Sequence, residues 1–96
     1  METEDICRKA INHYGMFTQI DKAIEEMGEL IVVLEHFKNR KLDKAAIVTE
    51  IADVHIMTTQ LSLIFGEREV AREVTAKLNR LEGRIEYDKQ RSKTEQ

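Results

Sequence analysis

The chain has 96 residues, of which 42% are hydrophobic, 34% charged and only 5% aromatic, with no proline. This composition favours one helical domain with a modest core, and it argues against a β-sandwich or a disordered chain. The net charge of −3 does not favour binding to the negatively charged backbone of a nucleic acid. "METEDICRK" lacks the features of a secretory signal, and no apolar run is long enough to span a bilayer. With Cys7 as the single cysteine, we expect a cytoplasmic protein without membrane or nucleic-acid partners.

Two helices are predicted in the first half of the chain. The first runs from about Thr3 to Tyr14 and ends at Gly15. Thr18 is a predicted N-cap for the second helix, which continues to about Asn39. This second helix carries an apolar stripe with a 3.6-residue period. Its members are Ile20, Ala23, Ile24, Met27, Ile31 and Leu34.

Two further helices are predicted in the second half. Asp43 is expected to cap a helix that runs to Phe65 and stops at Gly66. A fourth helix starts near Glu67, and a polar tail from about Asp88 is expected to fray. The apolar positions of the fourth helix are Val70, Val74, Leu78, Leu81 and Ile85.

The elements together indicate an all-α protein, an antiparallel bundle of about four helices. Residues 1–96 form a single predicted domain, with its core in residues 17–87 and its polar tail in 88–96. The second and third helices are apolar on more than one side, which one short subunit cannot cover. We therefore expect a homodimer at least, and a homotetramer is also compatible.

Acidic residues recur at the same spacing on the two central helices. Glu25, Glu26 and Glu29 crowd one turn of "KAIEEMGEL", and Glu50 and Asp53 repeat the three-residue step in "VTEIADVHIM". The second pair begins a stripe that is otherwise hydrophobic, with Val54, Met57, Leu61 and Ile64. Burying an ionised carboxylate without a partner is costly, so these positions need an explanation beyond solubility.

Antiparallel packing of the two central helices would bring these acids together. With a turn near residues 39–43, Glu29 is expected near Asp53 and Glu26 near the next turn. Converging carboxylates either take up protons or hold cations. An all-oxygen set suits Mg²⁺ or Mn²⁺. Each motif taken alone is also compatible with a solvated glutamate surface.

Other kinds of site find little support. Ferritin-like di-iron bundles need glutamate three residues before histidine, and no histidine here has one. The histidines are His13, His36 and His55, and all three are interpreted as surface or loop residues. One cysteine and scattered histidines disfavour a zinc site, and no glycine-rich phosphate loop is present.

The paired motifs resemble a known family. "EEMGE" at 25–29, followed after 20 residues by "EIAD" at 50–53, is similar to the EExxE…ExxD signature of the MazG-like all-α nucleoside triphosphate pyrophosphohydrolases. The block "VTAKLNRLEGRI" at 74–85 resembles the basic helix that commonly follows in this family. The resemblance covers about residues 17–87.

The resemblance implies hydrolysis of ribo- or deoxyribonucleoside triphosphates to a monophosphate and pyrophosphate. By motif position, the Mg²⁺ ligands and catalytic residues would be Glu26, Glu29, Glu50 and Asp53. Glu25 would orient a ligand or pair with Lys22. Bound Mg²⁺ would neutralise phosphate charge and activate a water for attack on the α-phosphorus, with Glu29 or Glu26 as the preferred general base.

Basic side chains are the expected partners of the other phosphates. Lys77, Arg80 and Arg84 fall on one side of the fourth helix, where they would hold the β- and γ-phosphates or simply form a solvated face. Lys22 and Lys41 are weaker candidates. The residues considered for the nucleobase pocket are Phe17, Gln19 and Ile20, with core or loop positions as the alternative.

Three functions remain open at this point. The first is a nucleoside triphosphate pyrophosphohydrolase of nucleotide-pool house-cleaning. The second is the related phosphoribosyl-ATP pyrophosphohydrolase of histidine synthesis. The third is a catalytically silent helical module that interacts with or regulates another protein.

Overall fold

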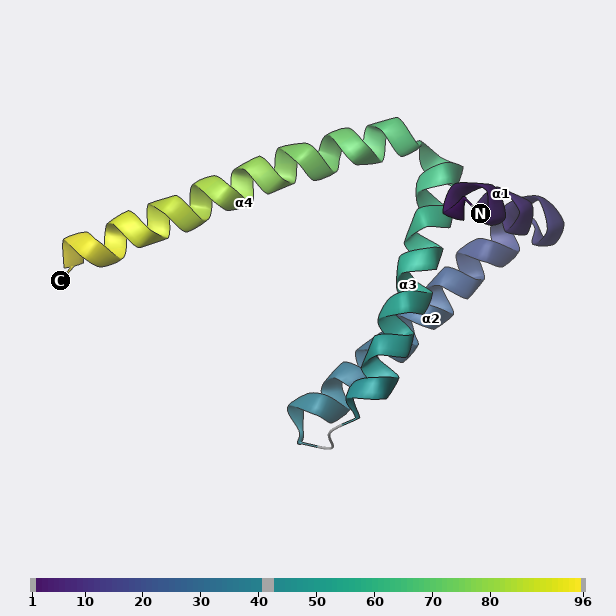
Figure 1. The fold of residues 1–96 in the computed structure, drawn as a ribbon, viewed down its shortest axis with the longest axis horizontal. Coiled ribbons are helices and arrows are strands. Elements are labelled where there is room, and N and C mark those ends of the chain that lie inside the picture. Colours follow the sequence, from purple (N-terminus) through teal and green to yellow (C-terminus); the bar gives the residue numbers. More distant parts are fainter. Residues whose placement is uncertain (1, 41–42, 96) are drawn as a thin grey trace. The chain divides into compact units, whose positions relative to one another are not determined.

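A computed structural model of the protein describes residues 2–40 and 43–95, and within these ranges it contains helices and no strand. The helices are α1 (Thr3–Tyr14), α2 (Met16–Lys38), α3 (Lys44–Phe65) and α4 (Glu67–Glu95), as Figure 1 shows. The prediction of an all-α fold is confirmed. The chain forms two compact units, one of α1, α2 and α3 up to Phe65 and one of α4 from Gly66 onward. No helix of the described part is long and apolar enough to cross a membrane.

A single glycine separates α1 from α2. Gly15 has φ 95°, a value that L side chains rarely adopt, and its N–H donates to the Ile11 carbonyl at 2.9 Å. Its own carbonyl accepts the N–H of Gln19 at 3.1 Å, so α2 begins directly after it. The prediction that Thr18 caps α2 is wrong, because the glycine makes the turn and Thr18 lies inside the helix.

The boundaries of α3 agree with the sequence signals. The Asp43 carboxylate accepts the N–H of Ala46 at 3.0 Å, which is the predicted N-cap contact. At the other end, Gly66 follows Phe65 with φ 129°. α4 continues through Glu95, so the segment from Asp88 is helical, and its expected fraying stays a prediction. Residues with good helix propensity fill this segment, and Lys89 pairs with Glu86 at 3.8 Å.

The core of the first unit lies where α2 runs antiparallel to α3, and α1 packs against both (Figure 1). Its buried apolar residues are Cys7, Ala23 and Met57. The apolar stripe expected on α2 is only partly inside, because Ile24 and Ile31 keep 64% and 62% of their surface exposed. α2 is apolar on more than one side, and α1 and α3 together cover only part of its apolar surface.

Candidate functional site

A buried pair of amides sets the alignment of α2 on α3. The Gln19 side chain donates from Nε2 to the Gln60 Oε1 at 2.8 Å, and both residues are buried. In this antiparallel alignment Glu26 lies opposite Asp53, and Glu29 lies opposite Glu50. The sequence predicted Glu29 near Asp53, whereas the alignment set by Gln19 and Gln60 places Glu29 one helical turn away, opposite Glu50.

The predicted carboxylates converge at this interface. Glu26, Glu50 and Asp53 each offer an oxygen, and these three atoms lie within 4.8 Å of one another. Glu25, Glu26 and Glu29 form a second group with the same spacing. Glu26 belongs to both groups and is the most buried of the five, at 8% exposed. We call these five residues the acidic cluster.

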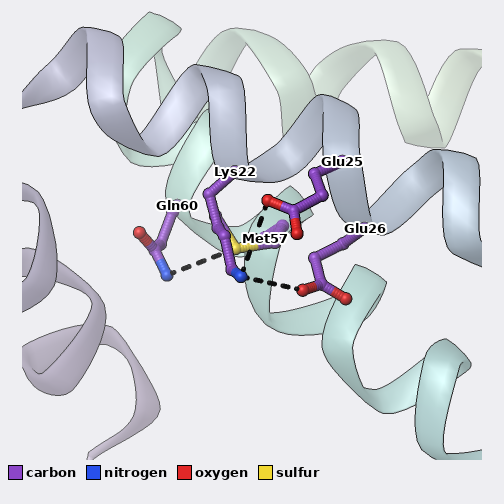
Figure 2. Close-up of polar contacts among 5 residues, drawn as sticks. All are labelled: Lys22, Glu25, Glu26, Met57 and Gln60. Atoms are coloured by element: carbon purple, nitrogen blue, oxygen red, sulfur yellow. Dashed lines mark hydrogen bonds and ion pairs between the residues drawn. The ribbon is translucent and has the colours of Figure 1, made fainter.

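Lys22 lies one turn before the acids of α2 and is held by two of them. Its Nζ is 3.3 Å from Glu26 Oε1 and 3.7 Å from Glu25 Oε2 (Figure 2). The hydrogen bond to Glu26 and the charge of Glu25 raise the pKa of the Lys22 ammonium, which stays cationic. The predicted pairing of Glu25 with Lys22 is thus confirmed, and a phosphate would share this lysine with both carboxylates.

One lysine does not satisfy the whole cluster. Glu26 Oε2 and Glu50 Oε2 are buried and lack a hydrogen-bond partner among the described residues. Burial and the charges of Glu29, Glu26 and Asp53 raise the pKa of the Glu50 carboxyl. The charge of Glu26, followed by burial and Glu25, raises the pKa of Glu29. Two carboxylates of the cluster are therefore poised to take up protons or a cation.

This arrangement fits a hard divalent cation. Buried carboxylate oxygens without partners are uncommon in folded proteins, and each one calls for a proton or an ion. The donors are all carboxylate oxygens, which Mg²⁺ and Mn²⁺ prefer. Among the described residues, neither group of metal-binding geometry includes a histidine or Cys7. His13, His36 and His55 are all exposed, though on helices rather than loops.

A cavity of about 440 Å³ adjoins the cluster on α2. Glu25 belongs to both the cluster and the cavity lining, and Lys22, which pairs with the cluster, lines the cavity too. The remaining lining residues are Tyr14, Thr18, Gln19 and Asp21. Of the three pocket residues considered from the sequence, only Gln19 lines the cavity; Phe17 is 75% exposed and Ile20 is half-buried. Tyr14 and Thr18 were missed because nothing in the sequence shows that the turn at Gly15 folds α1 back beside α2.

The other predicted phosphate ligands lie elsewhere in the chain. Lys77, Arg80 and Arg84 are exposed residues of α4, which forms the second unit, and their role stays a prediction. Lys41 lies outside the described residues.

Comparison of the chain with models of protein families, with curated proteins and with solved structures finds no match. The geometry of the acidic cluster therefore carries the functional argument, with the motif resemblance beside it.

Proposed function

We propose that the protein is a Mg²⁺-dependent nucleoside triphosphate pyrophosphohydrolase, which releases a nucleoside monophosphate and pyrophosphate. The observation that supports this most is the convergence of Glu26, Glu50 and Asp53 within 4.8 Å, with two buried oxygens that find no hydrogen-bond partner in the part of the chain that the structure describes. A solvated glutamate surface would leave those oxygens in water. The order and spacing of the acids also match the motif resemblance.

In this proposal Glu26, Glu50 and Asp53 hold the metal, and Mn²⁺ would substitute for Mg²⁺. When bound, the ion would neutralise phosphate charge and lower the pKa of a coordinated water. Glu29 is exposed and has a raised pKa, which suits a carboxylate that accepts a proton from the attacking water. Lys22 orients Glu26 and Glu25 through its two ion pairs.

The cavity beside the cluster would receive the nucleoside part of the substrate. Tyr14 offers an aromatic face for stacking, and Gln19 and Asp21 offer polar groups for the base or sugar. Lys77, Arg80 and Arg84 of α4 stay candidates for phosphate contacts on the sequence pattern alone. We place the activity in cytoplasmic house-cleaning of the nucleotide pool.

The test is pyrophosphate release from a panel of ribo- and deoxyribonucleoside triphosphates and phosphoribosyl-ATP, with and without Mg²⁺. We expect Mg²⁺-dependent release that collapses in Glu50→Gln and Asp53→Asn. Glu35→Gln is the matched control, since Glu35 is an exposed acid of α2 that pairs only with Lys38 among the described residues. Release from phosphoribosyl-ATP alone would favour the enzyme of histidine synthesis.

A metal-binding assay tests the proposed site independently of hydrolysis. Mn²⁺ titration followed by electron paramagnetic resonance should show saturable binding in the wild type and in Glu35→Gln, and much weaker binding in Glu50→Gln. Saturable binding without hydrolysis of any substrate would identify a silent helical module that keeps a metal. Absence of both would refute the proposal.

A further inference from the structure

The cavity beside the acidic cluster presents hydrogen-bond acceptors to a ligand. Gln19 lines it although this residue is only 7% exposed, and its Nε2 donates to Gln60 Oε1 at 2.8 Å. Its own Oε1 accepts no hydrogen bond from the residues that the structure describes, so a buried side chain keeps an acceptor for the ligand. Lys22 is the cation of this lining, and Glu25 and Glu26 already hold its ammonium (Figure 2).

Asp21 supplies the anionic acceptor of the cavity. It lies four residues before Glu25, so the two carboxylates are neighbours on the surface of α2 and both line the cavity. Glu25 pairs with Lys22 at 3.7 Å, whereas Asp21 forms no ion pair or side-chain hydrogen bond within residues 2–40 and 43–95. A carboxylate can accept through both oxygens at once. Asp21 therefore suits a ligand edge that carries two neighbouring N–H donors.

Guanine is the nucleobase with such an edge, because its N1 hydrogen and its N2 amino group lie side by side. Adenine and cytosine carry a ring-nitrogen acceptor beside their amino group, and uracil and thymine flank one N–H with two carbonyl oxygens. Those acceptors would face the carboxylate with like partial charge. We infer that the cavity selects guanine nucleotides, with the two oxygens of Asp21 accepting from N1 and N2. This inference rests on the proposed function, since it names the substrate of the same site.

The place of Asp21 relative to the metal ligands fits a nucleotide. Asp21 precedes Glu26 by five residues, which is a rise of roughly 7.5 Å along the helix axis. With the α-phosphate at the cluster, the sugar spans this interval and the base reaches Asp21. Tyr14 lines the same cavity, is 60% exposed, and makes an edge contact with the His13 ring at a centroid distance of 4.7 Å. Its phenol ring would stack on a purine over a larger area than on a pyrimidine.

A comparison of GTP with ITP tests the inference, because the base of ITP lacks only the N2 amino group. We expect Mg²⁺-dependent pyrophosphate release with kcat/KM for GTP roughly 10- to 100-fold above that for ITP, the ratio typical of one hydrogen bond to a charged acceptor. ATP, CTP and UTP should also fall below GTP. Asp21→Asn should lose most of this preference, because an amide sets a donor against one of the two N–H groups. Glu35→Gln is the matched control and should keep it.

Two results of this assay would overturn the inference. A wild-type protein that hydrolyses GTP and ITP with equal kcat/KM would refute guanine selection and leave the proposed function standing. A preference for GTP that persists unchanged in Asp21→Asn would refute the assignment to Asp21. Circular dichroism would verify that both variants keep their helices.

Binding of GMP and IMP, measured by isothermal titration calorimetry with Mg²⁺ present, separates base recognition from hydrolysis. GMP should bind more tightly than IMP by a similar factor in the wild type and in Glu35→Gln, but not in Asp21→Asn. If no triphosphate is hydrolysed, the proposed function fails, and tighter binding of GMP that depends on Asp21 would still support a guanine site. Equal binding of GMP and IMP, or binding of neither, would overturn it.

Discussion

Removing one member of the buried amide pair should destabilise the protein, while removing both should not. Gln19 and Gln60 are 7% and 4% exposed and share a hydrogen bond of 2.8 Å. Gln60→Met would leave the Gln19 amide buried without this partner, because methionine has a similar shape but no matching group. Such an orphaned polar group costs about 1–3 kcal/mol. The reverse change, Gln19→Met, should cost a similar amount.

The double variant is the informative one. Two methionines would fill the same space without any polar group to satisfy, so the loss should be much smaller than the sum of the single losses. For a unit of this size, each kcal/mol corresponds to roughly 4–8 °C in Tm. Urea unfolding followed by far-UV circular dichroism, at one fixed protein concentration, would give the four free energies of the cycle.

Two outcomes would refute this reasoning about the amide pair. One is single variants that unfold at the wild-type urea concentration, which would mean that the amides find other partners. The other is strictly additive losses, which would mean that the two side chains do not interact. A consequence for the site follows, because this pair aligns α2 with α3: the single variants should also bind Mn²⁺ more weakly than Glu35→Gln does.

Further predictions concern the acidic cluster, the cysteine and two glycines. The pKa values of Glu50 and Glu29 are raised above 4.5, so the stability that their protonated forms contribute is complete below that pH and is lost as pH rises through the raised values. Without metal, the urea midpoint of the wild type should therefore fall as pH rises above 4.5, and that of Glu50→Gln should fall less steeply. Mg²⁺ should restore the stability of the wild type near neutral pH. Equal dependence of the urea midpoint on pH in the two proteins would contradict this prediction. Burial raises the pKa of the Cys7 thiol, so iodoacetamide should label the native protein far more slowly than the urea-unfolded chain; comparable rates would show that the α1 packing opens readily. Gly15→Ala places a side chain at φ 95° and should lower the free energy of unfolding by about 1–3 kcal/mol. Gly83→Ala, in the exposed interior of α4, should stabilise its helix by up to about 1 kcal/mol. Thermal unfolding compares the two variants, and a higher Tm for Gly15→Ala than for Gly83→Ala would contradict both predictions.

Local signals in the sequence predicted most helix boundaries correctly. Asp43 at the start of α3 and Gly66 at its end act through contacts within a few residues, so spacing alone identifies them. Thr18 was misassigned because two local signals competed. Gly15 both ends α1 and precedes the first residue of α2, because glycine adopts the positive φ that this turn requires.

The identity of the clustered acids was predictable, but their pairing was not. Glu50 and Asp53 stood out because they begin a stripe that is otherwise apolar, which is a property of one helix. Their partners on α2 depend on where the chain reverses and on which side chains lock the two helices together. The contact that aligns the two helices is the Gln19–Gln60 hydrogen bond, between residues that are 41 positions apart. Neither glutamine belongs to a recognisable pattern, since a buried amide pair has no sequence period.

The alignment of α2 on α3 also decides which side of α2 meets the carboxylates of α3. α3 covers the line of Ala23 and Glu26 on α2, whereas Ile24 and Ile31 on one flank stay largely exposed. Rotating α2 to bury Ile24 against α3 would draw Glu26 away from Asp53 and expose it to water.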